Sequence, residues 1–241
     1  MQWIKVCMIM LSLTLLSSAE HNVSKAEQKK LDSASKVKPL SKTKFWVTRD
    51  SGEEYEMDLL GKNFIVVSLR EKGADGLIYA VDKEGLVWWA ENISSGAMGN
   101  ETPSSIYPML FKREKHMSKQ NPSSSGRNNM NLSLWFTYRG HAIHLGNPNK
   151  ASHGCVHVGR KGAQALFDWA NTETKIVITR ERYLPFVRRD LAEMGYKATD
   201  APKRIQKYLR ENPLVKPDLS IIERSGTPKP TIVKQDAKDM F

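Results

Sequence analysis

A thiol and four imidazoles lie close together in residues 138–158. This segment holds four of the six histidines of the chain and Cys155, one of its two cysteines. A thiolate is the strongest nucleophile among the common side chains, and a nearby imidazole can take its proton and later return it to a leaving group. The segment therefore indicates chemistry at a site. Its histidines are His141, His144, His153 and His157.

The sequence Ser152-His153-Gly154-Cys155 fits acyl transfer through a thioester. His144 precedes it across a Gly-Asn-Pro-Asn turn, so two neighbouring segments could place this imidazole beside the thiol. Gly154 has no side chain and lets a substrate approach the backbone closely. Backbone N–H groups around Gly154 and Cys155 could stabilise a developing oxyanion.

Two other interpretations fit the same spacing. His141-x-x-His144 together with His153-x-Cys155-x-His157 could supply zinc ligands, because alternate residues of a strand share one face. The histidines could also be structural, with His141 and His157 simply exposed or hydrogen-bonded. Spacing alone leaves all three interpretations open.

The N-terminus has the pattern of a secretory signal peptide. Lys5 precedes a near-continuous apolar run, and Ser17-Ser18-Ala19 then provides a cleavage site, so residues 1–19 are expected to be removed. We expect export to the periplasm or cell wall. Cleavage would remove Cys7, leaving Cys155 without an intramolecular partner in a compartment that favours disulfides.

The charge balance favours an anionic partner. The chain has 37 Lys and Arg against 26 Asp and Glu, a formal net charge of +11. For an exported protein this basic surface suits an anionic wall polymer or membrane surface, and we expect no nucleic acid partner.

Strand patterns dominate the middle of the chain. Residues 20–60 are predicted to be a basic linker and lead-in, because the Lys-, Ser- and Gln-rich part to about residue 44 shows no apolar period. Apolar runs then predict strands over 63–69, 77–81, 86–90, 132–138, 141–144 and 175–179, with one helix over 162–171. We expect a mainly β fold with some α: a β-rich mixed sheet or sandwich with one late crossover helix.

The C-terminal part changes to helical spacing. Residues 182–225 are predicted to be a small helical segment, with helices over 184–194 and 202–211. Residues 226–241 are predicted to be a disordered tail. The helical segment weakly resembles a degenerate peptidoglycan-binding module.

The central motif resembles a known family. Ser152-His153-Gly154-Cys155-Val156, preceded by Ala142-Ile143-His144, is similar to the signature of the L,D-transpeptidase (YkuD-type) catalytic domain. The loop 92–103, which ends in Thr-Pro, is similar to a second motif of that family. The resemblance covers about residues 64–179, and we place the catalytic domain at residues 61–181.

The resemblance implies a function in peptidoglycan synthesis, cell wall biogenesis and cell shape. Cys155 would be the nucleophile and His144 its general base, while Ser152, His153 and Gly154 would shape the pocket and the oxyanion site. Cys155 would attack a stem-peptide carbonyl, D-alanine would leave, and an amine of a neighbouring stem would resolve the thioester into a cross-link. No metal and no cofactor is implied.

Several alternatives share these residues. An L,D-carboxypeptidase would use water as the acceptor, and a zinc-dependent enzyme or a non-catalytic wall-binding protein are further hypotheses. His157 stands where the family has Arg or Asn, so an altered substrate contact is expected there. Tyr138 and His141, beside the strand that leads to His144, are further candidates for binding substrate.

Overall fold

The protein is described by a computed structural model that covers residues 24–118 and 128–193 of the chain. Within these ranges no helix is both long and apolar enough to cross a membrane. The elements are α1 (Lys25–Leu31), β1 (Ser35–Pro39), β2 (Lys44–Arg49), β3 (Glu54–Asp58), β4 (Phe64–Leu69), β5 (Asp75–Val81), β6 (Val87–Ser94), β7 (Ser105–Pro108), β8 (Phe111–Arg113), β9 (Met117–Ser118), β10 (Asn128–Asn129), β11 (Ser133–Trp135), β12 (Ala142–Leu145), β13 (Val156–Val158), α2 (Arg160–Trp169), β14 (Lys175–Thr179) and α3 (Leu184–Glu193).

A nine-stranded mixed sheet forms the body of the molecule. Its strand order is β7-β14-β4-β5-β6-β13-β12-β11-β8. The pairs β14–β4 and β12–β13 are parallel, and α2 makes the connection from β13 to β14. The predicted mainly β fold with a mixed sheet and a late crossover helix is confirmed.

Strand β4 illustrates why several strands appear in the sequence as nearly continuous apolar runs. All six of its residues are buried. Because successive side chains of a strand point to opposite faces, Ile65 and Val67 enter one hydrophobic cluster and Phe64 and Val66 enter another. A strand covered on both faces takes apolar residues on both, so β4 is apolar except at Ser68 and lacks the alternation of a half-exposed strand.

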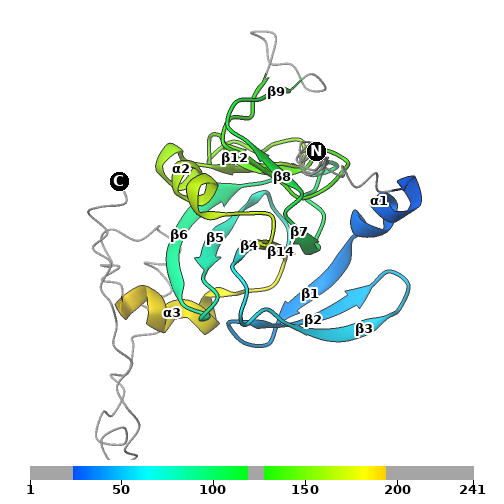
Figure 1. The fold of residues 1–241 in the computed structure, drawn as a ribbon, viewed down its shortest axis with the longest axis vertical. Coiled ribbons are helices and arrows are strands. Elements are labelled where there is room, and N and C mark those ends of the chain that lie inside the picture. Colours follow the sequence, from blue (N-terminus) through cyan, green and yellow to red (C-terminus); the bar gives the residue numbers. More distant parts are fainter. Residues whose placement is uncertain (1–23, 119–127, 194–241) are drawn as a thin grey trace, which may run out of the picture.

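The two clusters define the layers of the molecule. One cluster contains Leu166 of α2 and the other contains Val187 of α3, so the two helices cover opposite faces of the sheet. Figure 1 shows α2 against the upper part of the sheet, with α3 and the small sheet β1-β2-β3 below. Phe45 of β2 stacks on Tyr183 at a centroid distance of 6.1 Å, which attaches the small sheet to the second cluster.

Residues 24–60 differ from the predicted linker. They form α1 and a three-stranded antiparallel sheet. In β1 the buried residues Ser35, Val37 and Pro39 alternate with exposed lysines, so the period is two and only one of the three inward residues is a large hydrophobe. That short, weak alternation explains why the sequence showed no apolar period here.

Most of the predictions for the two ends of the chain concern residues outside the described ranges. The predicted helix over 184–194 corresponds to α3. The signal peptide, the second C-terminal helix and the tail fall outside the described ranges, and the domain boundaries stay predictions.

Candidate active site

Strands β12 and β13 bring Cys155 and His144 to one face of the sheet. The strands are parallel, with His144 paired to His157, and the same register sets Ala142 beside Cys155. Paired residues of adjacent strands share a face and successive residues alternate, so the side chains of His144, His157 and Cys155 project to the same side. A strand spacing of about 4.8 Å and a rise of about 3.3 Å per residue put the Cα atoms of His144 and Cys155 roughly 8 Å apart.

The imidazole of His144 is held as a neutral base. Its Nδ1 lies 2.9 Å from the carbonyl oxygen of Leu145, and because a carbonyl only accepts, Nδ1 carries the proton and Nε2 keeps its lone pair. Only 4% of the residue is exposed, and this burial lowers its pKa to about 4. The bond to Leu145 opposes the shift, and His157 and His116 add to it.

The thiol of Cys155 is held by the residues that enter β12. Its Sγ lies 3.8 Å from the carbonyl oxygen of Gly140. Burial raises the pKa of the Cys155 thiol, and a hydrogen bond from the backbone N–H of Ala142 partly offsets the rise. Near neutral pH the pair is therefore a neutral thiol and a neutral imidazole, so attack by sulfur has to be accompanied by transfer of its proton.

Ser152 ties together the turn that carries Cys155. Its hydroxyl donates to the carbonyl of Cys155 at 2.6 Å and accepts from the N–H of Gly154 at 3.0 Å. Its backbone pairs with the opposite loop, through Ser152 N–H to Ser95 oxygen at 2.9 Å and Ala97 N–H to Ser152 oxygen at 3.0 Å. The Gly154 N–H, one of the predicted oxyanion donors, is thus engaged by Ser152.

Gly154 is the position where the turn needs glycine. Its φ is +116°, and a Cβ there would lie 2.7 Å from Cδ2 of His141. The Gly154 carbonyl accepts from the Thr102 hydroxyl at 2.8 Å, and that hydroxyl also accepts from the N–H of Gly96 at 3.1 Å. Thr102 thereby joins the loop after β6 to the cysteine turn.

A cleft opens beside this turn. Its volume is about 320 Å³, and it contains two of the predicted site residues, His141 and His153. His153 is exposed, whereas burial lowers the pKa of His141 and its Nδ1 lies 2.8 Å from the Thr137 hydroxyl. Tyr138 is 40% exposed on the neighbouring turn and is not a lining residue. The lining residues are Gly99, Asn100, Glu101, Pro103, Arg139, His141 and His153.

His157 lies behind the base and does not line this cleft. Its ring packs edge-to-face on His144 at a centroid distance of 5.0 Å, and a Cβ on Gly146 would lie 2.6 Å from it. Its Nδ1 lies 3.0 Å from the carbonyl oxygen of Lys150 and 3.2 Å from the Ser94 hydroxyl. Burial lowers the pKa of His157. These contacts join the loop between β12 and β13 to the ring of His144, and a substrate contact of His157 stays a prediction.

Three residues of this region were missed by the sequence reasoning: Thr102, Arg139 and Asp32. Thr102 belongs to the Thr-Pro motif already noted, and a hydroxyl in a glycine-rich loop was a usable signal for it. Arg139 lies next to the predicted Tyr138. Asp32 bonds the backbone at residues 138 and 139 from far along the chain, and nothing local to its sequence indicates that.

The described part of the chain contains no group of side chains that matches the zinc site considered from the sequence. Residues 24–118 and 128–193 contain no group of three or more His, Cys, Asp or Glu side chains that could hold a metal ion. The rings of His141 and His157 are instead engaged by different parts of the backbone and by hydroxyl groups.

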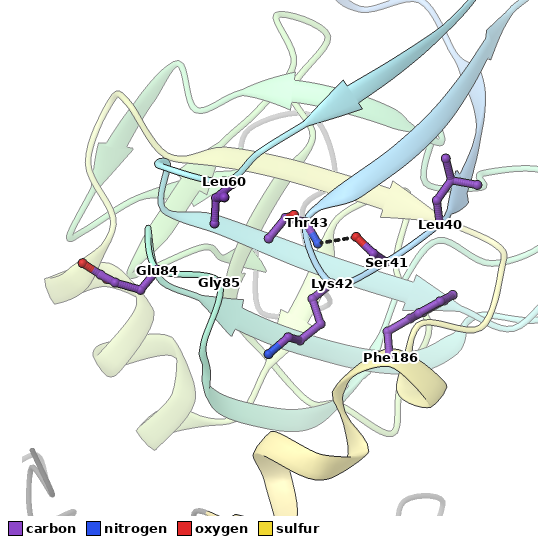
Figure 2. A pocket seen from close by; sticks show the side chains of 8 residues that line it. All are labelled: Leu40, Ser41, Lys42, Thr43, Leu60, Glu84, Gly85 and Phe186. Atoms are coloured by element: carbon purple, nitrogen blue, oxygen red, sulfur yellow. Dashed lines mark hydrogen bonds between the residues drawn. The ribbon is translucent and has the colours of Figure 1, made fainter. Parts of the chain in front are cut away.

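A larger hollow, of about 390 Å³, lies away from the thiol. Figure 2 shows it between the β1–β2 turn, the turn before β6 and α3. Its polar groups already have partners: the Ser41 hydroxyl accepts from the Thr43 N–H at 3.3 Å, and Lys42 pairs with Asp190 at 2.9 Å. None of the predicted site residues lines it, so the cleft at His141 and His153 is the candidate site.

The central part of the chain matches a known protein family. Residues 62–178 match the family model described as the L,D-transpeptidase catalytic domain, YkuD. The predicted resemblance to the YkuD family is confirmed for these residues. The match contains the cysteine turn, β12 and the Thr102 loop, whereas α1 and the three-stranded sheet precede it. No curated protein matches the chain by sequence.

Solved L,D-transpeptidase structures show a distant likeness. The enzyme from Stackebrandtia nassauensis is 18% identical over 51% of this chain and 57% of its own, with a TM-score of 0.42. That from Mycobacterium smegmatis is 14% identical over 61% and 77%, with a TM-score of 0.41. L,D-transpeptidase 1 of Mycobacterium tuberculosis is 15% identical over 61% and 82%, with a TM-score of 0.39. The chain thus spans just over half of the first structure, and the YkuD assignment rests on the family model.

Proposed function

We propose that this protein is a cysteine L,D-transpeptidase that acts on peptidoglycan stem peptides. The observation that carries the proposal is the free thiol of Cys155, the only cysteine among residues 24–118 and 128–193, on the same sheet face as His144 within a YkuD catalytic domain. His144 can act as the base, because its Nδ1 carries the proton and its Nε2 can accept one. An anionic wall or membrane surface as a further partner, and export to the periplasm or cell wall, belong to the same proposal.

The reaction follows from the protonation states of the pair. As Sγ of Cys155 attacks the carbonyl that precedes the terminal D-alanine, Nε2 of His144 takes the thiol proton. The tetrahedral intermediate collapses to a thioester when the C–N bond breaks, and the imidazolium returns its proton to the leaving D-alanine amine. An acceptor amine then attacks the thioester, losing its proton to His144, and the thiolate is released and reprotonated.

Burial of His144 suits a base that acts only during the reaction. An imidazolium in this dry position is unfavourable alone, but a negative oxyanion forming nearby stabilises it. The base therefore gains strength as the tetrahedral intermediate forms. A neutral resting thiol also limits side reactions of the free enzyme, because only the thiolate is a strong nucleophile.

The test is the fate of a synthetic tetrapeptide stem incubated with the full chain. We expect D-alanine release and a cross-linked dimer, both abolished in Cys155→Ala while the folded state is kept. A carbapenem should add one covalent mass, mapped to Cys155. Cross-linking by a folded Cys155→Ala variant would refute the proposal.

The same assay separates the alternatives that use the same cleft. If water is the acceptor, a tripeptide accumulates and no dimer forms, which would identify an L,D-carboxypeptidase. Activity that is lost to a strong chelator and restored by zinc would support the zinc hypothesis. Wall retention by a chain without any acyl-enzyme would indicate a non-catalytic wall-binding protein.

A further inference from the structure

The segment before the family domain contacts the active site directly. Residues 24–39, which we call the N-terminal arm, comprise α1 and β1 and lie outside the matched range 62–178. Strand β1 is fixed on the main sheet: the Ser35 N–H donates to the Ser104 carbonyl at 2.6 Å, and the Thr179 hydroxyl donates to the Val37 carbonyl at 2.5 Å. The arm is therefore held in one place relative to the catalytic domain.

Asp32, at the end of α1, turns its carboxylate onto the segment that leads to His144. One oxygen accepts the N–H of Tyr138 at 2.8 Å and the other accepts the N–H of Arg139 at 2.9 Å. The residue is 6% exposed. Two bonds from one buried carboxylate to consecutive amides fix both the position and the orientation of that backbone.

The turn that Asp32 holds also contacts the thiol. Within the turn, Gly140 N–H donates to the Thr137 carbonyl at 3.3 Å and His141 N–H donates to the Thr137 hydroxyl at 3.0 Å. The Gly140 carbonyl faces Sγ of Cys155 at 3.8 Å, and Cδ2 of His141 lies 2.7 Å from the position that a Cβ of Gly154 would take. The path from Asp32 to the sulfur thus consists of the hydrogen bond to the Arg139 N–H, the backbone of residues 139 and 140, and the contact between the Gly140 carbonyl and Sγ.

We propose that Asp32 is a positioning residue of the reaction: it fixes the turn 137–141 so that the Gly140 carbonyl and the Ala142 N–H hold the sulfur of Cys155 in its reactive position. The inference rests on the proposed role of Cys155 as nucleophile. It makes the N-terminal arm part of the catalytic unit, although the arm lies outside the family domain.

The test compares two buried carboxylates in the full-length protein. In Asp32→Asn the amide keeps one acceptor and sets an NH₂ group against a backbone N–H, so one bond is lost. Asp190→Asn is the matched control, because Asp190 is 5% exposed, accepts the Val87 N–H at 3.1 Å and pairs with Lys42, and neither partner lines the cleft at His141 and His153. Both variants are expected to unfold at a lower temperature than the unmodified protein.

Activity and thiol reactivity should separate the two variants. We expect Asp32→Asn to lower kcat for stem-peptide cross-linking roughly 10- to 100-fold with little change in KM, because a sulfur displaced by a fraction of an ångström misses its attack geometry. The pH dependence of the rate at which iodoacetamide alkylates Cys155 should also change. Peptide mapping distinguishes alkylation of Cys155 from alkylation of Cys7. Asp190→Asn should leave kcat and alkylation as in the unmodified protein.

Folded Asp32→Asn with unchanged kcat and alkylation would overturn the inference, as would equal losses of kcat in both variants. If Asp32→Asn does not fold, Asp32→Glu takes its place, since it keeps the carboxylate but displaces it by one methylene. Unchanged kcat and alkylation in Asp32→Glu would overturn the inference as well. If the unmodified protein forms no cross-links, the proposed function fails, yet alkylation still tests Asp32 because it needs only the thiol.

Discussion

The depressed pKa of His144 should appear as a pH dependence of stability that one substitution removes. Folding lowers the pKa of this imidazole from 6.5 to about 4, chiefly by burial. Between these two values the unfolded chain binds a proton that the folded protein does not. Falling pH therefore favours the unfolded state, and the loss of stability begins below about pH 6.5 and is complete below about pH 4.

The size of the effect follows from the same two pKa values. The full difference corresponds to about 3 kcal/mol, and about 2.5 kcal/mol of it should be lost between about pH 7.5 and pH 4.5. Other groups titrate over this range, so only the difference between the protein and a His144 variant isolates the imidazole. His144→Asn suits this purpose, because an amide can still donate to the Leu145 carbonyl but binds no proton.

Urea unfolding at a series of pH values measures the effect. We expect the free energy of unfolding of His144→Asn to fall by about 2–3 kcal/mol less than that of the unmodified protein from pH 7.5 to 4.5. Equal slopes for His144→Asn and the unmodified protein would refute a base held neutral by burial.

Two further predictions concern the scaffold of the cysteine turn. Thr102→Val should lower the free energy of unfolding by about 2–4 kcal/mol, because the Gly96 N–H and the Gly154 carbonyl each lose a buried partner worth about 1–3 kcal/mol. Thr102→Ser keeps the hydroxyl and is the control. Equal denaturant curves for the two variants would contradict a role of the hydroxyl in stability. Gly154→Ala should cost about 1–3 kcal/mol of backbone strain plus a clash with the His141 ring. Gly52→Ala, at φ +83° with nothing within 4 Å, measures the strain alone, so equal losses in the two alanine variants would show that the clash is absent.

The sequence by itself was enough to predict the chemistry that we propose and several of the strands next to it. Ser152 to Cys155 and the upstream His144 are close in the chain, so residue type and spacing were enough to indicate a thiol and a base. Apolar runs such as those of β4 and β14 were equally clear, because burial on both faces makes most of their positions apolar. Where burial was partial and strands were short, as in β1, the same reasoning failed.

Only the tertiary structure decided which groups surround the pair. Asp32 reaches Tyr138 across 106 residues, and Thr102 reaches Gly154 across 52. Both bonds end on backbone N–H or carbonyl groups, which every residue of the chain carries, so no side-chain pattern marks the partner. The four histidines illustrate the same limit. They are identical in type and near in sequence, yet sheet register and burial set His144 on the same face as the thiol, His157 against the ring of His144, and the other two at the cleft.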